Sequence, residues 1–337
     1  MAHGSWESTI DNQQSTMLLT EITINAVLNR ISREGIALAH WWDNKVVAFD
    51  PPQYKTAYPY GGYCALGFGS LALDPALFDG DWDPPFSCPV TVKYTATDEG
   101  SAATLFSGNG HLMKFNETEV VYDLYGPSYS AVVTDSTAYN DTLVDVMTTL
   151  CGAGILNLTL DTTYARNPSP AVLHTTSGDQ LAINLASDMC AFFNHLFYIS
   201  GSTLYLVDMQ IDNGSRTIDG FEFFPAAYEY PAPLRLAWAG SFVVTTGYPY
   251  GDELTVLPFH TTQANVETAL GDILDTMAML TAAIPVPLTG DLPAPGEKVE
   301  LTDTRLQNDT DIAIRARTIR YDFDNEEVLI TGEGGVL

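Results

Sequence analysis

The C-terminal part of the chain reads Pro293-Ala-Pro-Gly-Glu-Lys-Val-Glu-Leu-Thr-Asp303, then Ile312-Ala-Ile-Arg-Ala-Arg-Thr-Ile-Arg-Tyr-Asp-Phe323, then Asn325-Glu-Glu-Val-Leu-Ile-Thr331 and a glycine-rich end. A Pro-Gly pair opens the first segment, and Asp324-Asn325 separates the second from the third. Such pairs favour tight turns, and apolar and polar residues alternate between them. The pattern predicts an antiparallel β-meander that carries no cluster of catalytic side chains.

The first 125 residues show the same alternation and predict an N-terminal β domain (1–125), a barrel or a sandwich. Residues 22–28 alternate as in a half-buried strand. Residues 36–42 and 45–49 flank Asp43-Asn44, which predicts a two-residue hairpin turn. At 337 residues the chain is too long for one hydrophobic core, so two or three domains are expected.

Residues 126–218 predict a smaller α/β insert of two helices and a hairpin. Residues 142–151 place apolar side chains on one helical face and stop at Gly152. A second helix follows Ser177, and residues 196–199 and 203–207 predict the hairpin. The apolar side of this second helix is expected to consist of Leu181, Leu185, Met189, Phe192 and Phe193.

Residues 219–337 return to β patterning and predict a second β domain. It includes one helix over 263–282, with apolar residues at helical spacing, packed against that domain before the closing meander. The expected fold class is therefore mainly β with a smaller α/β insert.

The composition is strongly acidic. The chain has 42 Asp and Glu residues against 14 Lys and Arg residues, a formal net charge of −28. Such a charge repels phosphate backbones and anionic membranes, so DNA is expected to pass without being bound. The N-terminus lacks the pattern of a signal peptide, and no apolar run reaches the length of a membrane span. The sequence predicts a soluble protein made in the cytoplasm, with no membrane segment.

Candidate catalytic, metal and cofactor residues are sparse. Asp79, Asp81 and Asp83 alternate as in a calcium loop, but proline stands at loop position six and valine at position twelve. A solvated acidic loop is the default interpretation. The four cysteines are scattered, the histidines stand singly, and no nucleotide-binding or serine-hydrolase motif occurs. We therefore expect no catalytic site, no cofactor and no metal, and no enzymatic activity.

Two further features leave alternatives open. The aromatic residues between Phe221 and Tyr230 suit sugar stacking or, more often, core and subunit packing. Arg315, Arg317 and Arg320 stand out in so acidic a chain. They are predicted to meet carboxylates within the subunit or across a subunit interface, and an ordinary exposed strand face is the alternative.

The order of the predicted parts carries a resemblance to a known family. A β domain, an α/β insert, and a β domain with one helix before its closing meander follow one another. The segment His195-Leu-Phe-Tyr-Ile-Ser-Gly-Ser-Thr-Leu-Tyr-Leu-Val-Asp208 and the ending from Pro295-Gly296 to Gly334 add to this order. Together they resemble the tail hub (baseplate hub) proteins of long-tailed bacteriophages and gene transfer agents.

This resemblance implies a structural virion protein with two tail-tube-like β domains. Three subunits would form a ring that continues the tail tube and gives DNA an acidic channel during ejection. The implied partners are further copies of the chain, the distal tail protein, the tape-measure protein, and central tip or fibre proteins. Two alternatives stay open: another tail component, such as a distal tail or fibre-attachment protein, and a carbohydrate-binding or carbohydrate-active β protein.

Overall fold

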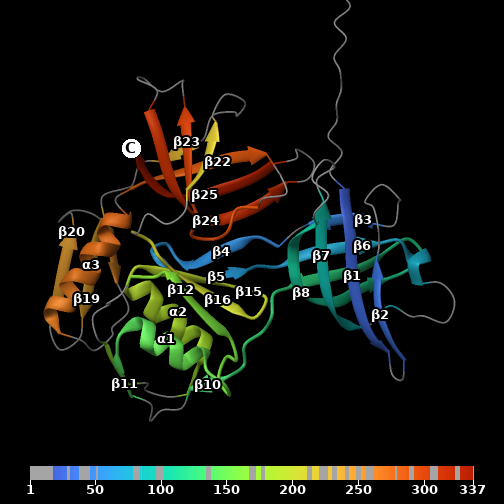
Figure 1. Ribbon diagram of the computed structural model, residues 1–337, viewed down its shortest axis with the longest axis horizontal. Coiled ribbons are helices and arrows are strands. Elements are labelled where there is room, and N and C mark those ends of the chain that lie inside the picture. The colour runs from blue at the N-terminus through green and yellow to red at the C-terminus, as the bar shows by residue number, and fades with distance from the viewer. Residues whose placement is uncertain are drawn as a thin grey trace, which may run out of the picture.

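The computed structural model describes most of the chain. The described residues are 18–28, 31–37, 46–50, 52–78, 84, 86–95, 102–133, 138–166, 172–175, 179–210, 215–219, 227–229, 234–239, 243–247, 252–255, 262–277, 279–287, 292–303, 310–322 and 327–336. They are mainly β, with three α-helices among them, as the sequence predicts. Figure 1 shows a sheet at one end of the molecule, a helical layer at the other, and a second large sheet between and above them.

The N-terminal sheet has seven strands and is antiparallel throughout, in the order β2-β1-β7-β8-β9-β6-β3. Alternation directs one face inward, as in β9, where Val120, Tyr122 and Leu124 are buried. β2 and β3 lie at its two ends, and they do not pair with each other among the described residues, which form an open sheet. Its strands are β1 (Leu18–Leu28), β2 (Ile31–Ala37), β3 (Val46–Asp50), β6 (Gly69–Leu73), β7 (Ser87–Thr95), β8 (Ala102–Phe115) and β9 (Val120–Tyr125).

The hairpin predicted around Asp43-Asn44 stays a prediction. β2 ends at Ala37 and pairs with β1, whereas β3 pairs with β6. Residues 38–45, which include the expected turn, lie outside the described residues.

The second large sheet combines strands from three separate parts of the sequence. Its order is β12-β16-β15-β5-β4-β24-β25-β22-β18, and β23 pairs with both β24 and β17. Its strands are β4 (Tyr54–Tyr58), β5 (Gly61–Leu66), β12 (Thr159–Tyr164), β15 (His195–Ser200), β16 (Thr203–Asp208), β17 (Ser215–Asp219), β18 (Ala227–Glu229), β22 (Leu280–Pro287), β23 (Lys298–Asp303), β24 (Thr310–Asp322) and β25 (Glu327–Val336).

The C-terminal meander is confirmed as β23, β24 and β25, each antiparallel to the next. The predicted hairpin in the insert is confirmed as β15 and β16. The hairpin β4–β5 comes from the N-terminal part of the sequence, yet it lies between β24 and β15. The domain boundaries at 125/126 and 218/219 stay predictions, and this hairpin crosses into the region of the two later parts.

Three helices share one apolar core. They are α1 (Leu143–Cys151), α2 (Ala182–Phe192) and α3 (Gln263–Met277). Thr142 caps α1 by accepting a hydrogen bond from the Asp145 backbone N–H (3.3 Å). The predicted inward face of α1 is confirmed, because Leu143, Val146, Met147 and Leu150 are buried. Val266, Leu270 and Ile273 bring α3 into the same core.

Two details of the predicted helices are wrong. The third helix ends at Met277 and not at residue 282, because residues 280–287 form β22 and pair with β25 over eight positions. Leu181, expected on the apolar side of α2, is 38% exposed. It lies in a short strand before the helix, where it pairs with Val132.

Three small sheets complete the described fold. They are β10–β14 and β11–β13, both antiparallel, and the three-stranded β20-β19-β21 beside α3. Their bounds are β10 (Val132–Val133), β11 (Ala138–Asp141), β13 (Val172–Thr175), β14 (Gln180–Leu181), β19 (Leu234–Ala239), β20 (Val243–Gly247) and β21 (Asp252–Thr255).

Candidate functional site

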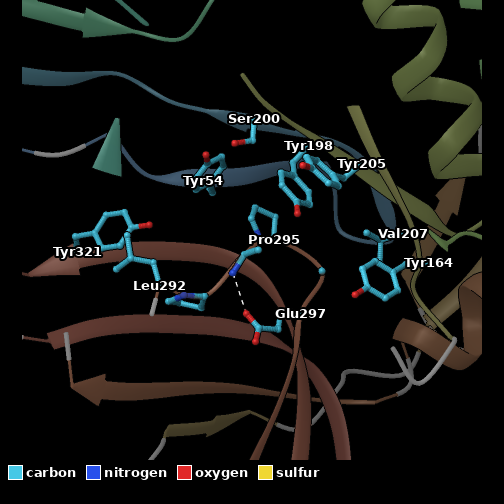
Figure 2. A pocket seen from close by; sticks show the side chains of 13 residues that line it. Tyr54, Tyr164, Tyr198, Ser200, Tyr205, Val207, Leu292, Pro295, Glu297 and Tyr321 are labelled. Atoms are coloured by element: carbon cyan, nitrogen blue, oxygen red, sulfur yellow. Dashed lines mark hydrogen bonds between the residues drawn. The ribbon is translucent and has the colours of Figure 1, made fainter. Parts of the chain in front are cut away.

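A tyrosine-lined cavity of about 490 Å³ lies where the β15–β16 hairpin meets the C-terminal meander. Its tyrosines come from five strands: Tyr54 on β4, Tyr164 on β12, Tyr198 on β15, Tyr205 on β16 and Tyr321 on β24. The loop 292–297 forms the opposite wall (Figure 2). Elements far apart in the sequence therefore build this cavity together.

Two stacked tyrosine rings form part of the cavity wall. Tyr198 and Tyr205 lie opposite each other in the β15–β16 register. Their rings stack with centroids 4.9 Å apart and an interplanar angle of 11°. Burial raises the pKa of Tyr198, and the nearby carboxylates of Asp161 and Glu297 add to the rise. Burial raises the pKa of Tyr54 to about 12. Both side chains are therefore neutral phenols at physiological pH.

The loop 292–297 is held by one hydrogen bond within it and by two that join its C-terminal end to β24. The Glu297 carboxylate accepts a hydrogen bond from the Ala294 backbone N–H (3.0 Å), as Figure 2 shows. The Gly296 N–H donates to the Ala316 carbonyl (2.6 Å), and the Ala316 N–H donates to the Glu297 carbonyl (2.8 Å). These bonds fix the loop to β24, so this wall of the cavity has a defined position.

The three arginines singled out from the sequence occupy different environments. Arg315 is buried, and its guanidinium donates to the carbonyls of Met209 (3.1 Å) and Gly296 (2.8 Å). It therefore ties the cavity loop to the end of β16. Arg317 donates to the Pro59 carbonyl (2.5 Å), and Arg320 is exposed. The structure does not bring the three together, and their role as subunit contacts stays a prediction.

The other residues considered in the sequence analysis are the candidate metal ligands and the cysteines. Asp79, Asp81 and Asp83 lie outside the described residues. Within the described ranges, no three His, Cys, Asp or Glu side chains gather as a metal site requires. All four cysteines are free and buried, and burial raises the pKa of the Cys64 thiol well above its usual value. No helix in the described part of the chain has the length and apolarity to cross a membrane.

A partly buried ionic network joins α3 to the β15–β16 hairpin. Arg166 donates to Asp208 on β16 through Nε (2.7 Å) and to Asp272 on α3 through Nη1 (2.7 Å). The Asp208 side chain is fully buried, and the Asp272 side chain is 22% exposed. Asn194 adds hydrogen bonds from Nδ2 to the Asp272 carbonyl (3.1 Å) and to Thr276 Oγ1 (2.7 Å). The network fixes α3 against the insert.

His195 lies beside this network in its neutral form. Nδ1–H donates to the Phe193 carbonyl (2.7 Å), and Nε2 accepts from the Arg166 backbone N–H (3.3 Å). Both ring nitrogens thus have partners only while the ring is neutral. Burial lowers the pKa of His195, although the facing carboxylates of Asp208 and Asp272 act in the opposite direction and Arg166 acts with burial.

His195 should make stability depend on pH. Its pKa is about 6.5 when unfolded and lower when folded, so unfolding takes up a proton. The contribution of neutral His195 to the free energy of unfolding is fully present above about pH 6.5. It is lost as the pH falls toward the folded pKa, by at most about 1.4 kcal/mol per pH unit. Urea midpoints measured from pH 7.5 to 5 should fall more steeply for the unmodified protein than for His195→Asn.

The matched control for this experiment is His111→Asn on β8, in the seven-stranded sheet. His111 packs edge-on against Phe86 with ring centroids 4.3 Å apart, remote from the ionic network. This variant should keep the steep dependence on pH. Equal slopes for His195→Asn and the unmodified protein would show that His195 is not the group responsible.

Comparisons with known proteins show the fold. No family model matches the chain, and no curated protein matches it in sequence. Three of the crystal structures that match do so over nearly their whole length. A tail protein from Neisseria meningitidis has 10% identity and a TM-score of 0.58, covering 93% of this chain and 96% of that chain. A prophage tail protein from Listeria monocytogenes has 11% identity and a TM-score of 0.55, covering 93% and 94%.

The third is the 43 kDa tail protein of a Shewanella oneidensis prophage, with 12% identity and a TM-score of 0.53. It covers 94% of this chain and 96% of that chain. The described helices and strands therefore have the arrangement found in phage tail proteins, and the resemblance to such proteins is confirmed at the level of the fold.

Proposed function

We propose that this protein is a non-enzymatic structural component of a bacteriophage tail: a tail-tip or baseplate hub whose three copies form a ring that continues the tail tube. The observation that carries the proposal is the similarity of fold to phage tail proteins, which covers 93–94% of this chain and 94–96% of the three neighbours. Because the similarity covers nearly the whole of both chains, it favours a shared architectural role.

The sheet edges support assembly with neighbouring subunits. β2 and β3 each pair with one strand among the described residues, so within that part of the chain they are the two edge strands of the seven-stranded sheet. Open edges offer unpaired backbone N–H and C=O groups, which soluble proteins protect or use for association. In a closed ring each edge is covered by the next copy of the chain. We assign β2 and β3 to such contacts.

The net charge of −28 supports the proposed channel. Acidic side chains on the inner wall of a ring repel the phosphate backbone, so DNA moves through without binding. The partners in this arrangement are the distal tail protein, the tape-measure protein, and central tip or fibre proteins. The protein would be made in the host cytoplasm and end in the tail of the virion, without a cofactor.

Stoichiometry tests this proposal. Mass photometry of the purified protein at micromolar concentration should show trimers, and a reconstruction of virion tails should place three copies at the tip. Six copies in the tail would assign the chain to a distal tail ring or fibre-attachment role. A strict monomer that is also absent from virions would contradict the structural proposal.

Arg320 provides a variant for the same experiment, because it is the exposed member of the three arginines. If it meets a carboxylate of a neighbouring copy, Arg320→Glu should weaken the trimer by at least roughly tenfold in dissociation constant, whereas Arg320→Lys should retain it. A trimer that is unaffected by Arg320→Glu would remove this contact from the proposal and leave the trimer itself standing.

A further inference from the structure

We propose that the tyrosine-lined cavity binds an arginine side chain carried by a partner protein. The cavity of about 490 Å³ falls within the range of roughly 300–1,000 Å³ that is typical of ligand pockets. The proposal goes beyond the structural role and does not depend on it, because it stands on the residues of the cavity alone.

The aromatic lining suits a flat cation. The rings of Tyr198 and Tyr205 are parallel and stacked on each other, so a further planar group can stack only on an outer face of the pair, and Tyr164 also lines the cavity (Figure 2). A guanidinium group stacks on such faces, and tyrosine rings attract cations through their quadrupole. Arginine suits the site better than lysine because its guanidinium is planar and less strongly hydrated than an ammonium group.

The charge around the cavity points in the same direction. The described residues that line it include Glu297, whose carboxylate accepts from the Ala294 N–H, and no lysine, arginine or histidine. Asp161, on β12, acts electrostatically on Tyr198 together with Glu297. Asp161 and Glu297 make the local field more negative, within a chain whose net charge is already −28, and the buried Arg315 guanidinium bonded to the Gly296 carbonyl offsets part of it. A cation gains from this field, whereas a carboxylate or phosphate ligand is repelled.

The polar atoms of the cavity suit the edge of the guanidinium. Tyr54 and Tyr198 are neutral phenols whose oxygens accept hydrogen bonds, and Ser200 lies beside them in Figure 2. A guanidinium carries five N–H donors and no acceptor, so a wall of phenol, hydroxyl and carboxylate oxygens can satisfy it. The loop 292–297 is already bonded to β24, and little ordering is required on binding.

The experiment compares two probes that differ in charge. The full-length protein is titrated with N-acetyl-arginine amide and with N-acetyl-citrulline amide, its neutral isostere, and binding is followed by ligand-observed NMR. The arginine probe should bind with a dissociation constant of roughly millimolar size, at least fivefold more tightly than the citrulline probe. Equal binding of the two, or no binding of the arginine probe up to about 20 mM, would overturn the proposal.

Two variants locate the binding. Glu297→Gln keeps an oxygen that accepts from the Ala294 N–H and removes the charge, so it should weaken arginine binding at least threefold. Glu300→Gln is the matched control, because Glu300 pairs with Lys298 on β23 and does not line the cavity. Tyr164→Ala should also weaken binding, and its side chain is exposed enough for the fold to tolerate the change.

A glycan probe tests whether the cavity binds carbohydrate instead of an arginine side chain. Methyl α-glucoside should not compete with the arginine probe, and binding of the glucoside in its place would assign the cavity to carbohydrate and reject the arginine. Stoichiometry in the tail is measured independently, so failure here leaves the hub proposal unaffected, and failure of the hub proposal leaves the cavity result unaffected.

Discussion

Replacing Gly61 with alanine is expected to lower the free energy of unfolding by about 2–5 kcal/mol, since both backbone strain and overpacking act at this position. Gly61 begins β5 with φ +139°, a conformation that residues with a side chain rarely adopt. A Cβ there would lie 2.3 Å from the His195 carbonyl oxygen and 3.5 Å from Ala191 Cα. Neither backbone atom can move without shifting β15 or α2.

Two glycines provide controls for this prediction. Gly201, in the β15–β16 turn, also has positive φ (+59°), but a Cβ there would meet nothing within 4 Å. Gly201→Ala should therefore cost only the backbone strain, about 1–2 kcal/mol. Gly271→Ala, within α3 and also uncrowded, should stabilise the protein by about 0.5–1 kcal/mol. Urea denaturation measures all three; a Gly61→Ala cost no larger than that of Gly201→Ala would show that β5 does not lie so close to His195.

Replacing Asp208 with asparagine should cost about 3 kcal/mol, because it leaves the guanidinium of Arg166 without its buried counter-charge. The Asp208 carboxylate is fully buried and accepts from Arg166 Nε (2.7 Å) and from the Gln210 backbone N–H (2.9 Å). The Arg166 side chain is 33% exposed, so water offsets part of the loss. The cost therefore falls at the low end of the range for broken buried pairs.

The matched variant is Asp272→Asn, on the other side of the same guanidinium. Its side chain is 22% exposed, and the pair is screened more strongly, so the expected cost is about 1 kcal/mol. A double-mutant cycle with Arg166→Met isolates the interaction between Arg166 and Asp208. A coupling energy near zero would be inconsistent with the ionic network, and equal costs for the two asparagine variants would argue against the difference in burial.

The parts of the fold that were predictable are those defined by local pattern. The face of α1 follows from apolar residues at helical spacing, and the β15–β16 hairpin follows from alternation around Ser200-Gly201-Ser202. The meander follows from turn residues at its corners. In each case the partner of a segment lies next to it in sequence, so short-range signals are sufficient.

Long-range pairing was not predictable. Nothing in residues 54–66 indicates that this hairpin leaves the N-terminal strands and lies between β15 and β24. The end of α3 was misplaced because residues 280–282 continue the helical spacing, yet pairing with β25 prevails. β25 also runs to Val336, beyond the predicted strand end at Thr331, since Gly332 and Gly334 let it approach β24 closely.

The cavity was missed for the same reason. The hairpin register places Tyr198 opposite Tyr205, and this pair could have been predicted from the sequence. The other tyrosines come from strands that are distant in the sequence, and no spacing rule brings them together. Arg315 was predicted to meet carboxylates within the subunit or across an interface, and the structure adds that its buried guanidinium donates to backbone carbonyls.

The route of the β4–β5 hairpin has a mechanical consequence. The chain leaves the seven-stranded sheet after β3, enters the second sheet as β4, and returns through β5 to β6. It crosses a third time after β9 and reaches the second sheet as β12 (Figure 1). The Gly67 N–H donates to the Gln53 carbonyl (2.8 Å) and binds the outgoing and returning strands together. A pulling or twisting load on one sheet is thus shared by three covalent tethers. The two sheets should therefore move as one rigid body. A single proteolytic cut in any one crossing leaves them covalently joined.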